Sequence, residues 1–161
     1  MVRAFRIVRD GPAEGSPAGW FRYVAEDGSF SLIGPGRPQQ GVSSRASRST
    51  FRAPGVVLVA EVEMLGGGSG ARRPRPALDR ETAIFLDDLG ALEQARRWTG
   101  FGQDLRLDVD ARRGDTRFRI RTFVSQRRLF RASAEWDGQP SPALTAIVEA
   151  FLGGLAPSSD A

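Results

Sequence analysis

The stretch Thr116–Ala134, TRFRIRTFVSQRRLFRASA, decides the fold, because its alternating residues predict two β-strands joined by a tight turn. A three-residue turn, Gln126–Arg128, places Val124 opposite Phe130 and leaves one face of the hairpin apolar throughout. A two-residue turn would instead bring the charged side chain of Arg131 onto that apolar face. Since a shift of one residue turns every side chain of a strand to the other face, the pattern predicts the three-residue turn.

The other face of the expected hairpin carries the arginines. In the three-residue register Arg119 lies across from Glu135, which makes an ordinary cross-strand ion pair. Arg121 and Arg131 have no acid near them in this register. A solvated sheet face is one interpretation, and a surface that binds the phosphates of nucleic acid or of acidic lipid headgroups is the alternative. The candidate partner-binding residues are Arg117, Arg121, Phe123 and Arg131.

Two turns indicate hairpins in the first 65 residues. The dipeptide Asp27-Gly28 favours a tight turn within residues 20–34. The dipeptide Pro54-Gly55 precedes the most apolar run of the chain, residues 56–65, whose β-branched side chains favour a strand. Residues 37–50 are polar and fit either a loop or an exposed strand.

An internal helix is expected after a loop at residues 66–77, where Pro74 and Pro76 argue against helix. Asp79 is a suitable N-cap. Apolar side chains then recur at helical spacing until Thr99-Gly100, and Gly90 marks a bend or a break. The residues with this spacing are Phe85, Leu89, Leu92 and Ala95.

The last helix has the clearest signals. Ser141 is a suitable N-cap, Pro142 suits the first helical position, and Gly153-Gly154 ends the helix. One stripe of its side chains is apolar, which predicts a helix packed against a core. The stripe consists of Leu144, Ile147, Val148, Phe151 and Leu152. Before it, residues 105–111 alternate apolar and charged side chains, which predicts a half-buried strand.

The composition excludes several kinds of site. The chain of 161 residues contains no Cys and no His, and every one of its 23 basic residues is Arg. Sites of the Ser-His-Asp and Cys-His kinds, His-based zinc sites, Walker A loops and Schiff-base lysines are therefore excluded. The glycine-rich residues 66–71 are not expected to bind a dinucleotide, because Pro74 and Pro76 argue against the helix that would have to follow them. Asp108 and Asp110 share a strand face and fit solvated acids facing Arg106 or Arg112 better than a cation site.

We therefore predict no catalytic residues, no cofactor and no metal, and no enzymatic activity. The net charge of +4 is weak support for a nucleic-acid partner. The amino end has no apolar stretch of the kind that signal peptides carry, and no run of residues is long and apolar enough to span a membrane. With Met1 as the start, a cytoplasmic location is expected.

The order of these elements, with two sequence motifs, resembles the PsbP/Mog-like superfamily. Residues 27–39, DGSFSLIGPGRPQ, are similar to the strand exit near the start of that family. The carboxyl-terminal hairpin and helix, RIRTFVSQRRLFRASAEWDG and AIVEAFLGGL, are similar to its last elements. Leu129-Phe130 stands where the family usually has Leu-Tyr, and Gly153-Gly154 stands where it has Ser-Phe.

The resemblance implies an α+β fold in which an internal helix and a C-terminal amphipathic helix pack on an antiparallel sheet. Residues 1–19 would form an amino-terminal extension with a short strand, residues 20–155 the domain, and residues 156–161 a flexible tail. Family members are mostly non-catalytic proteins that bind other proteins, assist assembly or act as chaperones. The expected function is a bacterial protein-binding or assembly module, and the alternative is an anion binder that uses the arginines of the hairpin.

Overall fold

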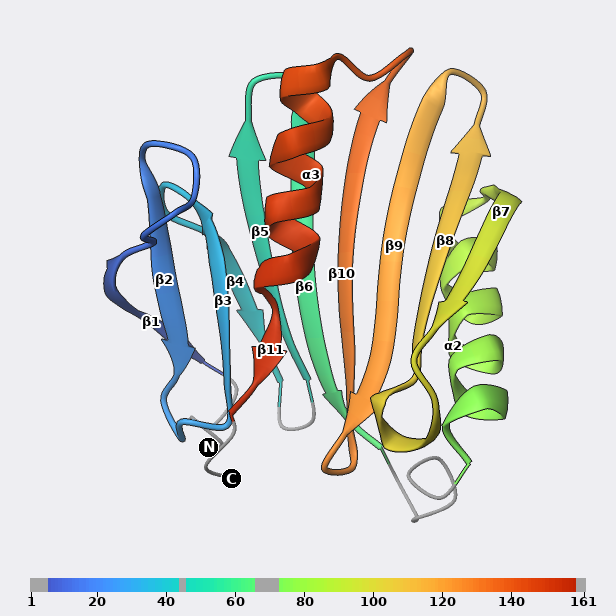
Figure 1. Ribbon diagram of the computed structural model, residues 1–161, viewed down its shortest axis with the longest axis horizontal. Helices are drawn as coiled ribbons and strands as arrows, with labels where there is room; N and C mark the ends of the chain where they lie inside the picture. The colour runs from blue at the N-terminus through green and yellow to red at the C-terminus, as the bar shows by residue number, and fades with distance from the viewer. Residues whose placement is uncertain (1–5, 44–45, 66–72, 159–161) are drawn as a thin grey trace.

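Two antiparallel sheets and two α-helices make up the computed structural model, which describes residues 6–43, 46–65 and 73–158 (Figure 1). The smaller sheet has the order β1-β2-β3-β11 and the larger one the order β4-β5-β6-β10-β9-β8-β7. The strands of the smaller sheet are β1 (Ile7–Pro12), β2 (Trp20–Ala25), β3 (Phe30–Pro35) and β11 (Ala156–Pro157). Those of the larger sheet are β4 (Gln39–Val42), β5 (Ala46–Ala53), β6 (Val56–Met64), β7 (Leu92–Thr99), β8 (Arg106–Arg113), β9 (Thr116–Ser125) and β10 (Arg128–Asp137). The helices are α2 (Pro74–Leu89) and α3 (Pro142–Gly154).

The larger sheet is covered on both faces, but by different elements. On one face, α3 and the smaller sheet enclose a core to which Phe51, Phe130 and Phe151 belong. On the other face, α2 covers a second core, formed chiefly by β8 and β9. The predicted α+β class, with an internal and a C-terminal helix on antiparallel strands, is confirmed. The described helices include none long and apolar enough to cross a membrane.

The predicted turn of the central hairpin is wrong. Strands β9 and β10 are joined by two residues, Gln126 and Arg127, so that Arg131 lies opposite Thr122. The prediction assumed that only one face of the hairpin is buried. The structure buries both faces of β10, with Phe130 in one core and Leu129 in the other. Arg131 thus lies on a covered face, and the partners described below offset only part of the cost of burying its charge.

Both residues of this turn have positive φ angles, which residues other than glycine disfavour. Gln126 has a φ of 50° and Arg127 a φ of 63°, the positive pair that a type I′ turn requires. Asn-Gly is the preferred sequence for such a turn. We expect the double substitution Gln126→Asn and Arg127→Gly to raise the free energy of unfolding by about 1 kcal/mol, as measured by urea unfolding. Arg127→Ala, which keeps a Cβ atom, should give no gain. Equal or lower stability of the Asn-Gly variant would contradict this turn geometry.

The internal helix begins earlier and ends earlier than predicted. It starts at Pro74. A proline is tolerated in the first turn of a helix, because the N–H group that it lacks would have no partner within the helix there. Asp79 is therefore no cap, and its carboxylate instead accepts a hydrogen bond from Arg96 Nη1 at 2.6 Å. The helix stops at Gly90, whose φ of 66° forms a left-handed C-cap. Residues 92–99 then form β7 at the edge of the larger sheet, so the predicted helical continuation is wrong.

Other predicted elements are confirmed. Hairpins form at Asp27-Gly28 and at Pro54-Gly55, where Ala53 pairs with Val56. Ser141 Oγ accepts a hydrogen bond from the Leu144 amide at 3.1 Å and so caps α3. The polar segment at residues 37–50 contains exposed β4 and the first part of β5. Residues 156 and 157, which the sequence assigns to a tail, pair with β3. The glycine-rich residues 66–71 lie outside the described part of the chain.

Candidate functional site

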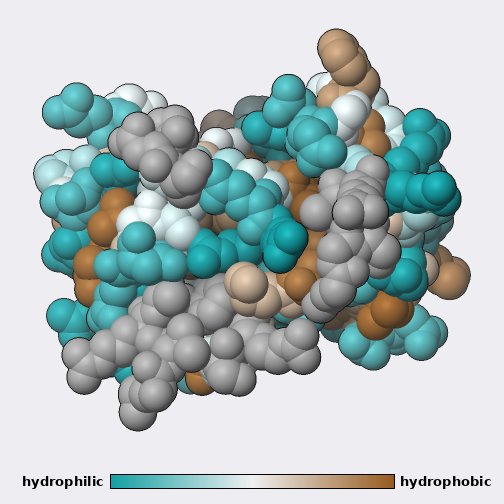
Figure 2. All heavy atoms as spheres, turned by 90° about the horizontal axis from the view of Figure 1, so that it is seen from below, coloured by the Kyte–Doolittle hydropathy of each residue, from teal (hydrophilic) through white to brown (hydrophobic). Residues whose placement is uncertain are grey.

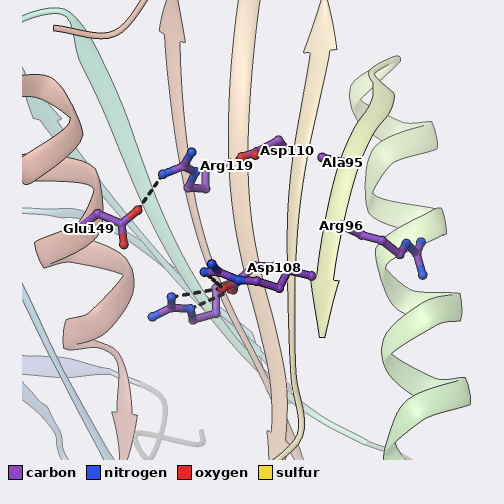
Figure 3. Close-up of a pocket in the computed structure, with 8 residues that line it drawn as sticks. Ala95, Arg96, Asp108, Asp110, Arg119 and Glu149 are labelled. Carbon is purple, nitrogen blue, oxygen red and sulfur yellow. Dashed lines mark hydrogen bonds and ion pairs between the residues drawn. The ribbon is translucent and has the colours of Figure 1, made fainter. Parts of the chain in front are cut away.

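A groove opens where α3 leaves the larger sheet uncovered (Figure 3). The apolar side chains of α3 pack over β6 and β10, while the first residues of β9 that point to the same face are arginines, followed by Phe123. The resulting hollow has a volume of about 250 Å³ and lies between α3 and the edge strand β7. We call it the charged groove; it is lined by Ala95, Arg96, Arg97, Asp108, Asp110, Arg119, Arg121 and Glu149.

Two chains of ion pairs cross the floor of the charged groove. Asp108 accepts hydrogen bonds from Arg121 Nε at 2.9 Å and Nη2 at 3.2 Å, and Arg97 Nη2 lies 3.5 Å from the same carboxylate. In the next row, Arg119 Nε donates to Asp110 at 2.9 Å. Strand register explains both rows, since Asp108 lies opposite Arg121 in the sheet and Asp110 opposite Arg119.

The second row extends to α3. Arg119 Nη1 donates to Glu149 Oε1 at 2.6 Å, and Figure 3 shows the two side chains meeting across the groove. Burial tends to lower the pKa of Arg119, but the hydrogen bonds and charges of Asp110 and Glu149 raise it above its ordinary value. Arg96 differs from the other arginines, since its side chain points away from the groove toward α2. The remaining three arginines face three acids, so the groove is charge-balanced.

The structure does not bring the four predicted partner-binding residues together. Arg121 lies in the charged groove, and Arg117 lies on the same face of β9, opposite Arg112. Phe123 is also on this face, but the residue is only 6% exposed and its ring stacks on that of Phe130 with centroids 5.0 Å apart. Most of this ring is therefore covered by the protein itself. Arg131 lies on the opposite face of the sheet, under α2.

Arg131 is held by the core that α2 covers. Its guanidinium lies 4.2 Å from the centre of the Phe85 ring, and its Nη2 donates to the Glu81 carbonyl at 3.4 Å. Glu61 of the neighbouring strand lies 3.9 Å away. Burial lowers the pKa of Arg131, although the charges of Glu61 and Glu81 oppose this shift. The side chain is 8% exposed, so little of it is available to a ligand.

Sequence reasoning missed the acids that pair with the arginines. The predicted pair between Arg119 and Glu135 is wrong, because in the two-residue register Arg119 lies opposite Ala134. Asp108 and Asp110 were expected to face arginines of their own strand, but each pairs with β9. The alternation of acids in β8 and of arginines in β9 was a usable signal for these pairs. Nothing in the sequence placed Glu149 beside them.

The described residues offer no carboxylate cluster for a metal. Within residues 6–43, 46–65 and 73–158, no three acids lie close enough together to hold an ion. Asp108 and Asp110 are each occupied by an arginine of β9.

The comparisons with known proteins bear on the fold. No protein-family model matches the chain, and no curated protein sequence does either. Among solved structures, the chain is similar to the solution structure of cyanobacterial PsbP from Synechocystis sp., with a TM-score of 0.65 and 9% sequence identity. The match covers 92% of this chain and 98% of the PsbP chain. The resemblance predicted from the sequence is thus confirmed at the level of the fold, and the protein has a PsbP-like fold.

Proposed function

We propose that the protein is a non-catalytic protein-binding or assembly module, and that the charged groove contacts its protein partner. The observation that supports this proposal most is the charge balance of the groove, in which every arginine on the floor has a carboxylate within 3.5 Å. Alternating charges of this kind complement a mixed protein surface and give specificity and orientation in protein interfaces.

The charge balance also argues against an anionic ligand. A nucleic acid or an acidic lipid surface binds most strongly to unpaired positive charge. Arg121 is engaged by Asp108, and Arg131 lies on the other face of the sheet. The hypothesis of an Arg-rich binding face on the hairpin therefore has less support than the protein-binding one. The two differ in salt dependence, because phosphate contacts would make the affinity fall steeply with salt concentration.

Arg97 is suited to a test by substitution, because its side chain is exposed. Its side chain is 75% exposed and makes one long ion pair, so its replacement should leave the fold intact. We expect Arg97→Glu to reduce recovery of the partner about tenfold when tagged protein is isolated from the native host and the co-purifying proteins are quantified. Reversed charge at this position would repel the acid of the partner that meets Arg97.

Arg52→Glu is the matched control. Arg52 is an exposed arginine on β5 whose side chain points to the other face of the same sheet. This variant should recover the partner as well as the wild type does. Equal recovery by Arg97→Glu and wild type would contradict a role for the groove. Turnover of a substrate by the purified protein would contradict the non-catalytic proposal as a whole.

The proposal also places the protein in the cytoplasm of a bacterium. Separation of host cells into cytoplasmic, membrane and exported fractions, followed by detection of the protein, tests this location.

A further inference from the structure

A single aromatic side chain projects from the loop between β7 and β8. Phe101 is 87% exposed, more than any other large hydrophobic residue that the structure describes. The loop lies at the lower end of the molecule in Figure 1. Seen from that end, the apolar surface is broken into separate patches by hydrophilic side chains (Figure 2). Phe101 is the one exposed large hydrophobic residue of this loop in the described part of the chain.

Backbone contacts shape the loop that carries this ring. The Asp104 amide donates to the Phe101 carbonyl at 3.2 Å and closes a short 3₁₀ turn over Gly102–Asp104. The backbone of Gly100, which has a φ of 76°, lies close to the Asp104 carbonyl oxygen. A Cβ atom at position 100 would be 2.5 Å from that oxygen, so a residue with a side chain would not fit there. Both contacts restrict the backbone conformations of the loop, and such restriction lowers the entropic cost of binding through Phe101.

Positive charge lies at the base of the loop that carries Phe101. Arg106 pairs in register with Thr99 at the base of the loop, and its guanidinium lies 5.3 Å from the centre of the Phe123 ring. Among the described residues, Arg106 has no carboxylate partner. Arg97 points to the same face one row further along the sheet, so this surface continues into the charged groove. Asp104 is the one acid that the described loop contributes.

We propose that Phe101 is the anchor by which the protein binds its partner, inserting into an apolar pocket of a second protein. Exposed and well-ordered aromatic residues commonly carry a large share of the binding energy at protein interfaces. The exposed Arg106 at the base of the loop and Arg97 in the next row of the same face would favour a pocket with an acidic rim. This inference rests on the proposed function and specifies the chemistry of the partner.

Site-specific photo-crosslinking tests the anchor directly. Benzoylphenylalanine replaces Phe101 in the full-length chain, which is then irradiated in cells of the native host. Ile84, which is 50% exposed on α2, carries the same label as a matched control. We expect one discrete product at position 101, containing a different protein, and none of that product at position 84. A product with twice the mass of the chain, or equal products at both positions, would overturn the proposal.

Affinity measurements then separate this inference from the proposed function. The probe is the partner isolated with the wild-type chain. We expect Phe101→Ala to weaken its binding at least tenfold, whereas Ile84→Ala leaves binding unchanged. If Arg97→Glu weakens binding and Phe101→Ala does not, the anchor is wrong while the groove remains the binding surface. If neither variant weakens binding, the anchor and the proposed binding surface both fail.

Discussion

Replacement of Phe51 by alanine is expected to lower the free energy of unfolding by about 3–5 kcal/mol. Phe51 is fully buried at the place where the two sheets and α3 meet. Its ring centre lies 5.6 Å from that of Tyr23 in the smaller sheet and 5.7 Å from that of Phe151 in α3. Truncation leaves a cavity that these rigid aromatic neighbours cannot fill, and a cavity adds to the cost of the lost apolar contacts.

Guanidinium unfolding followed by tryptophan fluorescence measures this loss. The adjacent residue supplies the control, because Arg52 is exposed and Arg52→Ala should change the free energy of unfolding by less than about 0.5 kcal/mol. A loss below about 1 kcal/mol for Phe51→Ala would mean that the smaller sheet and α3 do not pack on Phe51 as described. The result also concerns function, since α3 supplies Glu149 to the charged groove.

The second large effect is expected at Gly34, which lies against the same ring. A Cβ atom at this position would be 2.5 Å from Phe51 Cε1, well inside normal contact distance. We expect Gly34→Ala to lower the free energy of unfolding by about 1–3 kcal/mol through overpacking, measured in the same unfolding experiment. Gly41→Ala is the matched control, because Gly41 also lies in a strand and a Cβ atom there meets nothing within 4 Å.

A double-mutant cycle identifies the cause of the Gly34 effect. If the added methyl group clashes with the Phe51 ring, then Phe51→Leu should relieve part of the strain. The variant with both Gly34→Ala and Phe51→Leu should therefore lose less stability than the sum of the two single variants. Additive losses would show that the strain at Gly34 arises elsewhere in the backbone of β3.

Local signals explain most of the elements that were predicted correctly. The Ser141-Pro142 start and the apolar stripe of α3 act within one helix, so the sequence is enough to recognise them. The same is true of the turn at Pro54-Gly55 and of the alternation in β8, where Leu107 and Val109 are buried. Each of these signals spans few residues and depends little on the rest of the chain.

Errors arose where distant segments compete with a local pattern. Leu92 and Ala95 continue the helical spacing of α2, but the left-handed Gly90 ends that helix and β8 offers the next segment a strand partner. The length of the turn after β9 was predicted wrongly, because the prediction assumed that only one face of the hairpin is buried. Only the packing of α2 on one face and of α3 on the other makes the two-residue register favourable.

By itself, the sequence determined the fold class, the absence of His, Cys and Lys chemistry, and the hairpin and helix signals that resemble the PsbP/Mog-like family. Tertiary structure alone decided which arginines have partners. Arg121 meets Asp108 because β8 and β9 are neighbours, and Arg119 reaches Glu149 because α3 folds back over the sheet. The physical reason is that ion pairing depends on distance in space. Sheet order and helix packing set those distances, across 13 residues of sequence for Arg121 and Asp108 and across 30 for Arg119 and Glu149.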